Sequence, residues 1–264
     1  MNRRSAFIIL ALLFVFVSLN IYSEESTVSF VITQPPVGYP LFVTGDKTLQ
    51  TGGDLLYLNM DVMEEKMMIA GGTAFGNYQS CLSDRLALQA AFGGALLFGN
   101  KYDLMIGRLP LLIGGIVQPV KTSHFSFFLF ASAGGDIGIT DMTVTVPQWV
   151  LMTSTFIDDD TSVRTTAVNG LINGGAQFNI FARNFIISPF GSWTYTGGTY
   201  STTQTSTMSY DYPSSTGSIE NYSSIVFGFD ILYVPKNIAL SSQLRTTDNY
   251  TMISLSLKWL LMDK

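Results

Sequence analysis

The chain has 264 residues, and only 12% of them are charged although 47% are hydrophobic. Soluble domains carry about 25% charged residues, so this composition favours a chain embedded in a membrane. The net charge of −5 gives no basic footprint for a nucleic-acid partner. The single cysteine, Cys81, and the single histidine, His124, exclude an internal disulfide framework and a cysteine-based zinc site, and we expect no metal or cofactor.

The N-terminus has the pattern of an export signal. Asn2, Arg3 and Arg4 form a positive region, and the apolar run Ala6–Leu19 follows it. A small residue, Ser23, then precedes two glutamates. We predict a signal peptide over residues 1–23 and a single domain over residues 24–264. An uncleaved anchor helix is the alternative, but the apolar run is short for a membrane span.

Alternation of apolar and polar residues predicts β-strands along the remaining chain, because successive side chains of a strand point to opposite faces. The twelve stretches are Val37–Thr44, Asp54–Met63, Met67–Phe75, Leu86–Phe98, Tyr102–Val117, Phe125–Ile139, Met142–Met152, Thr166–Phe181, Phe185–Gly197, Tyr222–Val234, Ile238–Arg245 and Tyr250–Leu261. In the last of these, Ile253, Leu255, Leu257, Trp259 and Leu261 share one face, and Ser254, Ser256 and Lys258 share the other. Pro110 and Pro147 each remove a backbone donor, so we expect a kink or bulge there.

The connections between these strands alternate in length. Tight connections are expected at residues 63–66, 99–101, 140–141, 182–184 and 235–237, and the intervening loops are mostly longer, with the longest at Gly198–Asn221. Outer-membrane barrels have short periplasmic turns and longer external loops, so the alternation predicts a closed barrel with the end of its last strand at the periplasmic rim. Gly-Gly pairs begin at positions 52, 71, 93, 114, 134, 174 and 197, spaced by about one or two times the length of a strand with its connection. Glycines of this kind relieve crowding in a curved wall, and chance in a Gly-rich chain is the alternative.

The predicted fold class is therefore all-β, a closed antiparallel up-and-down transmembrane β-barrel of about 12 strands. Ten strands is the alternative, if Val37–Thr44 and one further stretch such as Met142–Met152 are not separate strands. A helical membrane protein would need apolar spans of about 20 residues, longer than those found here. A soluble sandwich would need polar outward faces, whereas these carry Ile, Leu and Phe.

With its export signal, amphipathic strands, aromatic strand ends and unequal connections, the chain resembles bacterial outer-membrane β-barrel proteins over residues 26–261. The resemblance implies location in the outer membrane of a diderm bacterium and insertion by the barrel-assembly machinery. It also implies a final strand that ends in an aromatic assembly cue. Trp259 holds that kind of position, although Leu260–Lys264 extend past it.

Two sets of residues are candidates for function. The predicted lumen residues are Asn59, Asp61, Asp136, Asn173, Gln177, Asn179, Asp230, Gln243 and Arg245. The predicted anchors at the membrane interface are Trp149, Trp193, Tyr233 and Trp259. We interpret His124 and Cys81 as loop residues without a catalytic role, and the run Asp158–Asp160 as a solvated acidic loop rather than a Ca²⁺ site.

The sequence favours a non-enzymatic barrel that serves as a porin-like channel or as a structural membrane protein. If a path exists, the acid excess favours cations or other small solutes of matching charge. The alternative is a surface adhesin or receptor, because the Tyr- and Ser-rich loop at 198–221 suits adaptable contacts with a surface ligand. A hydrolase is the third hypothesis, disfavoured by the lack of a carboxylate beside His124.

Overall fold

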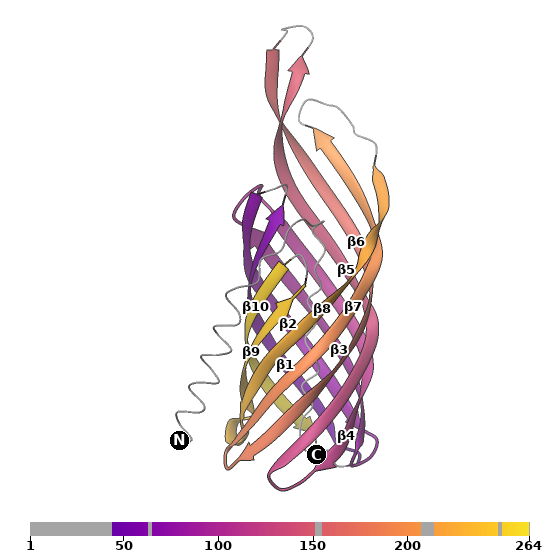
Figure 1. The fold of residues 1–264 in the computed structure, drawn as a ribbon, viewed down its shortest axis with the longest axis vertical. Helices are drawn as coiled ribbons and strands as arrows, with labels where there is room; N and C mark the ends of the chain where they lie inside the picture. Colours follow the sequence, from indigo (N-terminus) through magenta and orange to yellow (C-terminus); the bar gives the residue numbers. More distant parts are fainter. Residues whose placement is uncertain (1–43, 63–64, 151–154, 207–213, 248–249, 264) are drawn as a thin grey trace.

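A computed structural model describes residues 44–62, 65–150, 155–206, 214–247 and 250–263. These residues form ten antiparallel strands that close into a barrel (Figure 1). The strands are β1 (Lys47–Val62), β2 (Glu65–Cys81), β3 (Leu86–Gly99), β4 (Met105–Lys121), β5 (Phe125–Val150), β6 (Thr155–Ala182), β7 (Phe185–Ser206), β8 (Ser215–Tyr233), β9 (Ile238–Thr246) and β10 (Tyr250–Asp263). A single 3₁₀ turn, η1 (Val234–Lys236), precedes β9. Within the described ranges, no helix has the length and apolar character to cross a membrane.

The strand number corrects the prediction of twelve and confirms the alternative of ten. The barrel closes by pairing of β1 with β10, and β1 also pairs with β2, so no further strand enters the ring. The predicted strand Val37–Thr44 lies outside the described residues. Phe125–Ile139 and Met142–Met152 were predicted as two strands, but residues 125–150 form β5 without a turn. Thr140 and Asp141, expected to turn the chain, pair with Thr165 and Arg164 instead.

Because the predicted turn at residues 140–141 is absent, every connection before it lies at the opposite end of the barrel from the one predicted. We call the end where β1 starts and β10 finishes the terminal rim; it carries connections 82–85, 122–124, 183–184 and 234–237. The opposite end, the hairpin rim, carries connections 63–64, 100–104, 151–154, 207–214 and 247–249. The tight connections predicted for one rim therefore divide between the two. The terminal rim has only connections of two to four residues, whereas those of the hairpin rim reach eight, so what is wrong is the side assigned to the turns at 63–66 and 99–101.

Four strands extend beyond the others at the hairpin rim. Strands β5 to β8 have 26, 28, 22 and 19 residues, whereas the other six have 9 to 17. Figure 1 shows the β5–β6 and β7–β8 hairpins rising past the remaining wall. Much of the predicted loops at 154–165 and 198–221 is therefore strand. Their Ser and Thr content suggested loops, but Thr also favours strands when a neighbouring strand is available for pairing.

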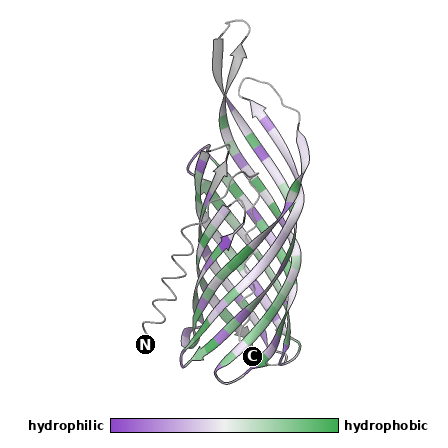
Figure 2. Cartoon of the chain, viewed as in Figure 1, coloured by the Kyte–Doolittle hydropathy of each residue, from purple (hydrophilic) through white to green (hydrophobic). Residues whose placement is uncertain are grey.

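Side chains alternate between lipid-facing and lumen-facing positions, as the closing strand predicted. On β10 the five residues Ile253, Leu255, Leu257, Trp259 and Leu261 are exposed on the outside. Ser254, Ser256 and Lys258 are buried inside, between Met252 and Leu260. The same alternation repeats around the wall, where apolar residues gather between the rims (Figure 2).

The outer face changes from apolar to polar along one line near the hairpin rim. On β6 the exposed side chain of Val168 is followed toward this rim by Thr166, and on β8 Ile225 is followed by Ser223. On β5 the last exposed apolar residue is Ile139, opposite Thr166, so the apolar edge lies one outward residue farther along β5 than along β6. An outward apolar band about 25 Å tall is the part of a barrel that lies in lipid. The extended parts of β5 to β8 lie beyond that band.

Each of the seven Gly-Gly pairs lies inside a different strand, one in each of β1 to β7. The inward-facing member of every pair has backbone of a neighbouring strand where its Cβ would be. These inward members are Gly52, Gly71, Gly93, Gly114, Gly134, Gly175 and Gly198. The pairs thus mark the places where the curved wall brings neighbouring backbones too close for a side chain.

We predict that Gly134→Ala destabilises the barrel by about 1–3 kcal/mol, the usual range for overpacking. A Cβ there would overlap the carbonyl oxygen of Leu111 on β4, and backbone cannot move aside as a side chain can. Gly107→Ala is the matched control, because its Cβ would meet nothing within 4 Å. Urea unfolding in detergent should separate the two variants, and equal midpoints would contradict this account.

Candidate functional site: the polar interior of the barrel

The interior has a polar belt between two apolar ends. Toward the hairpin rim, Leu56, Leu58, Met67, Ile69 and Met252 belong to one buried cluster. Toward the terminal rim, Ile186, Leu232, Ala239 and Leu260 form a second cluster, and Cys81, Ala87, Ile116, Phe128 and Phe130 form a third. Buried charged and amide side chains occupy the belt between these ends, and a few reach the ends themselves: Ser126 and Asn179 pair beside the terminal rim, and Arg245 pairs with Met252.

An ion pair between β4 and β5 lies on one wall of the belt. The Nη1 atom of Arg108 is 3.0 Å from Oδ2 of Asp136, and both side chains are at most 1% exposed. Asn169 of β6 donates from Nδ2 to the same carboxylate oxygen at 3.3 Å. The guanidinium of Arg108 covers Gly138, where any Cβ would collide with it. Glycine at position 138 therefore provides the space that lets the ion pair form.

A second ion pair lies on the wall formed by β8 to β10. Nζ of Lys258 is 2.9 Å from Oδ1 of Asp230, with 3% and 2% of these side chains exposed. The lysine reaches across β9 at Ala239, its neighbour in the ladder, whose small side chain leaves room. On the adjoining strand β1, Asp54 accepts a hydrogen bond from the Thr73 hydroxyl at 2.9 Å. The buried cation of Lys258 is thus paired with Asp230 of β8, and a second buried carboxylate, Asp54, lies on the adjoining strand β1.

Neutral hydrogen bonds complete the belt. Gln177 donates to Asn179 at 2.7 Å, and Asn179 donates to the Ser126 hydroxyl at 3.1 Å, all three being buried. Nearer the hairpin rim, the guanidinium of Arg245 lies 3.4 Å from the Ser224 hydroxyl. Each of these bonds connects adjacent strands except the one within β6, so side chains reinforce the backbone ladder from inside.

The charges described in the interior are balanced. The buried Asp, Glu, Lys and Arg residues are Asp54, Asp136, Asp230, Arg108, Arg245 and Lys258, which is three acids and three bases. An unpaired charge is costly away from water, and pairing reduces that cost. The acid excess of the whole sequence does not reach this part of the lumen. The expectation that the interior would favour cations therefore loses its basis.

Seven of the nine predicted lumen residues lie inside the barrel: Asp136, Asn173, Gln177, Asn179, Asp230, Gln243 and Arg245 are all buried. Asn59 is a correction, because it is exposed on the outer face while Leu56 and Leu58 point inward. Here the interior is apolar, so polarity did not identify the inward face. The side chain of Asp61 lies outside the described part of the chain.

Sequence reasoning missed three of the six interior charges: Asp54, Arg108 and Lys258. A usable pattern was present, since Arg108 and Lys258 are isolated charges within apolar stretches, GRLPLL and SLKWLL. A charged side chain in a membrane-spanning strand has only the lumen as an acceptable direction. Such isolated charges identify the inward face more reliably than amides do.

Three of the four predicted interface anchors are exposed on the outer wall. Trp259 and Tyr233 lie near the terminal rim, and the Tyr233 ring is 5.2 Å from that of Phe185. Trp193 lies at the edge of the apolar band nearer the hairpin rim, with its ring 5.9 Å from that of Tyr195. The side chain of Trp149 lies outside the described residues. Anchoring by these residues stays a prediction.

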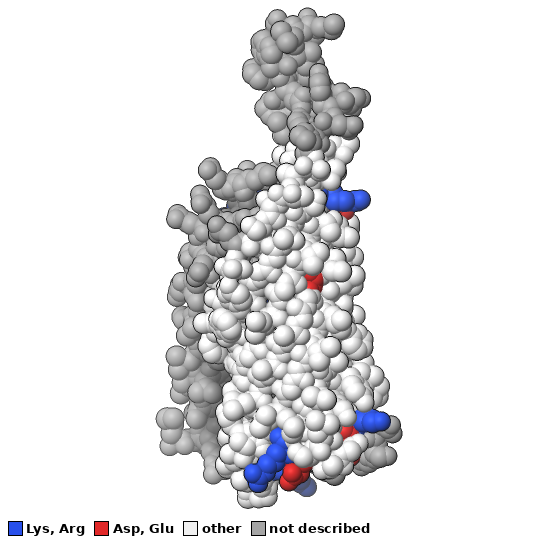
Figure 3. All heavy atoms as spheres, turned by 90° about the vertical axis from the view of Figure 1, so that its right-hand side faces the viewer, with Lys and Arg blue, Asp and Glu red and all other residues white. Residues whose placement is uncertain are grey.

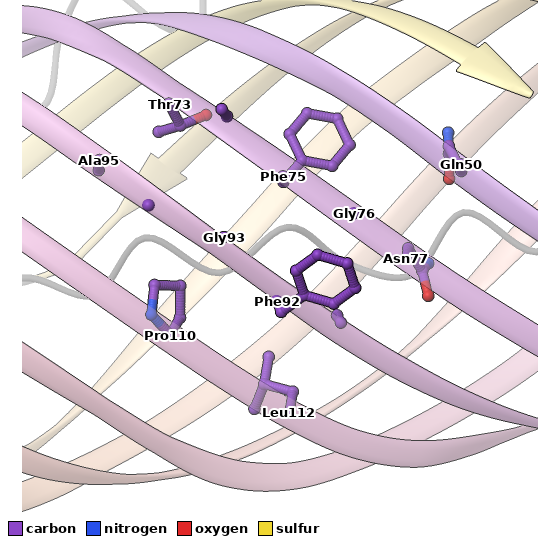
Figure 4. Close-up of a pocket in the computed structure, with 13 residues that line it drawn as sticks. Gln50, Thr73, Phe75, Gly76, Asn77, Phe92, Gly93, Ala95, Pro110 and Leu112 are labelled. Carbon is purple, nitrogen blue, oxygen red and sulfur yellow. The ribbon is translucent and has the colours of Figure 1, made fainter.

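A small recess of about 40 Å³ lies on the lumen wall formed by β1 to β4 (Figure 4). It lies where the β3–β4 ladder has no pairs at Gly93 and Gly94 opposite Leu109 and Pro110. The register is the same on both sides of this gap and Pro110 pairs with Asp136 of β5, so the bulge expected at Pro110 is not found. Pro147 likewise pairs with Asp158 without a register shift. Phe75 and Leu112 line the recess, and no ionisable side chain does. The recess thus suits contact with apolar groups rather than acid–base chemistry.

The candidate catalytic and metal residues do not come together. His124 and Cys81 were predicted in external loops, but both belong to the terminal rim: His124 is exposed beside the Ser123 hydroxyl at 2.8 Å, and Cys81 ends β2, buried near Phe128. Asp160 accepts a hydrogen bond from Thr145 at 2.8 Å, and its neighbours' side chains are not described. Among the described side chains, no group of three or more His, Cys, Asp or Glu residues could hold a metal ion.

Comparison with known proteins supports the fold class. No protein-family model matches the chain, and no curated protein sequence does. The outer-membrane protease OmpT from Escherichia coli is similar in structure, with a TM-score of 0.51 and 10% identity over 82% of this chain and 96% of that chain. The translocator domain of autotransporter NalP from Neisseria meningitidis has a TM-score of 0.46 and 9% identity, covering 83% and 89%. OprG from Pseudomonas aeruginosa has a TM-score of 0.36 and 6% identity, covering 85% and 99%.

These structures are bacterial outer-membrane β-barrel proteins, and the chain resembles that class. At 10% identity the similarity to OmpT shows the fold alone.

We predict that Arg108→Leu destabilises the barrel by about 3–5 kcal/mol, because it leaves the buried Asp136 carboxylate without its cation. The double variant Arg108→Leu/Asp136→Leu should recover most of that loss, since neither charge then remains buried. Urea unfolding of the two variants measures the difference. Equal destabilisation by the single and double variants would show that the ion pair does not govern stability here.

Proposed function

We propose that this chain is a non-enzymatic protein of the bacterial outer membrane whose barrel anchors a surface recognition sheet. The sheet consists of the extended parts of β5 to β8. The observation that carries the proposal is the length of these strands. A tilted strand needs about 9–11 residues to cross the membrane, and β5 and β6 have more than twice that number.

The orientation follows from the general architecture of this class. Barrels of the outer membrane keep both chain ends on the periplasmic side and their longer extensions outside. The terminal rim is then periplasmic, and the hairpin rim faces the cell exterior. Insertion would use outer-membrane lipid and the barrel-assembly machinery, as the resemblance implies.

The chemistry of the extended sheet suits contact with other molecules. β7 ends in TGGTYSTTQTS and β8 begins with STGSIENYSS, two stretches rich in Ser, Thr and Tyr. Tyr supplies rigid contact area and Ser supplies adaptable hydrogen bonds, a combination typical of recognition surfaces. The β8–β9 ladder begins at Ile225, so among the described residues the ladder pairs of β8 before that residue are with β7. A free edge offers backbone donors and acceptors to an added strand.

The absence of a catalytic role is part of the proposal. In the orientation above, His124 lies at the periplasmic rim, at the opposite end of the barrel from the extended sheet. The His124 ring forms a hydrogen bond with the adjacent Ser123 hydroxyl, and among the described residues no carboxylate orients that pair. A nucleophile and base on one exposed turn lack the positioning that catalysis requires.

We predict that shortening the β7–β8 hairpin abolishes surface binding while the barrel stays folded. Thr199 and Ser218 are paired residues, so residues 200–217 can be replaced by Asn-Gly to give a short hairpin turn. Binding of cells that display the protein to immobilised matrix proteins and glycans gives the readout.

The control for this variant is Gly107→Ala, a change on β4 outside the extended sheet whose added Cβ meets nothing within 4 Å, and it should keep binding. Heat-modifiable migration on gels reports folding of each barrel. Undiminished binding by the shortened and folded variant would contradict the recognition role.

A second candidate function is a narrow path for small solutes, favoured by the polar belt around the lumen. Because the described interior charges are balanced, we predict no preference for cations over anions. In liposome swelling, passage of uncharged sugars would support this function, and no swelling would eliminate it. In a planar bilayer, strong cation selectivity would contradict the charge argument.

A further inference from the structure

Every connection at the terminal rim carries or adjoins one exposed basic residue. Arg85 lies between β2 and β3, Lys121 ends β4, Arg183 lies between β6 and β7, and Lys236 lies between β8 and β9. Lys47 at the start of β1 is also exposed. Among the described residues of this rim, three acids, Asp46, Asp84 and Asp263, face five Lys and Arg residues, so the rim has a net charge of +2. Figure 3 shows charged side chains at this end and a wall above them with few charges.

Backbone hydrogen bonds join these connections into a ring. The carbonyl of Arg85 accepts from Gln118 at 2.7 Å, and the carbonyl of His124 accepts from Phe181 at 2.8 Å. Farther round, Asn184 accepts from Val234 at 3.0 Å, and Asn237 accepts from Leu260 at 2.9 Å. Each turn is thereby fixed to the next strand. The basic residues project from a rigid circle rather than from independent loops.

Aromatic side chains lie directly beside this basic ring on the outer wall. Phe185 and Tyr233 are paired residues that flank the turns of Arg183 and Lys236. Phe125, beside the Lys121 connection, stacks on Phe178 with centroids 5.3 Å apart. Aromatic residues sit at the headgroup level of a bilayer, and long basic side chains reach from there toward the surface.

The other rim has the opposite charge. Segments 61–66, 101–103, 141–164, 211–220 and residue 248, which lead to the hairpin-rim connections, contain eleven Asp and Glu residues and three Lys and Arg residues in the sequence. The acid excess of the chain is thus concentrated at the hairpin rim. An anionic surface would attract the terminal rim and repel the opposite one.

We propose that the terminal rim binds anionic phospholipid headgroups through the ring formed by Arg85, Lys121, Arg183 and Lys236. The four cations lie at headgroup level, and each can contact a lipid phosphate in the leaflet around it. A single basic residue near an anionic surface contributes about five-fold in binding. The proposal does not depend on what the extended hairpins bind.

The test uses Trp259 as a reporter of neighbouring lipid at this rim. In a Trp149→Phe/Trp193→Phe background, brominated phosphatidylglycerol and brominated phosphatidylcholine are compared as quenchers of Trp259 fluorescence in mixed vesicles. We expect phosphatidylglycerol to be preferred by about five-fold or more. The preference should fall toward one in high salt, because the ions screen exposed charges.

The decisive variant is Arg85→Gln/Lys121→Gln/Arg183→Gln/Lys236→Gln, which should lose most of the preference. Lys66→Gln/Lys101→Gln at the hairpin rim is the matched control and should keep it. Equal quenching by both lipids in the parent protein would overturn the proposal, as would an unchanged preference in the fourfold variant. Heat-modifiable migration checks folding, and if the fourfold variant fails to fold, a salt-independent preference in the parent protein overturns the proposal instead.

Discussion

Pairing of β1 with β10 is the constraint on which the rest of the structure depends. In lipid, every backbone N–H and C=O must find a partner within the protein, and a sheet achieves this only when it has no edge. Fourteen residue pairs, from Lys47 with Asp263 to Met60 with Tyr250, make this closure. Once the ring is closed, each side chain has one of two directions, toward lipid or toward the lumen. Beyond the membrane band that requirement ends, and there β5 to β8 leave edges unpaired by β4 and β9.

Charge follows the same division. Within the described interior, three acids and three bases are buried, and two ion pairs connect neighbouring walls of the belt. Outside, the apolar band is bordered by a basic terminal rim and by a hairpin rim whose sequence is rich in acids. The net charge of −5 for the whole chain is therefore the sum of a balanced interior, a basic terminal rim and an acidic hairpin rim. Arguments about solutes or lipids need the charge of the region concerned rather than that of the chain.

The candidate site was predictable where the belt is polar and not where it is apolar. Asp136, Gln177 and Asn179 were placed inside correctly because their outward neighbours, such as Ile137, Phe178 and Ile180, are apolar. Asn59 was misplaced because Leu56 and Leu58 fill the lumen near the hairpin rim. Arg108 needed a partner on β5 and a glycine at position 138, both distant in sequence, before its role was visible.

By itself the sequence determined the barrel class, the amphipathic strands and the glycine pair in each of β1 to β7, because alternation and crowding are local properties of a strand. It also left ten strands as an open alternative. Only the tertiary structure decided the strand number. Thr140 and Asp141 pair with residues of β4 and β6, and this pairing continues the strand where a turn was predicted. That one decision reversed the side of every earlier connection, because each strand crosses the barrel once. Pairing between distant segments, not local composition, therefore assigned each residue to a rim.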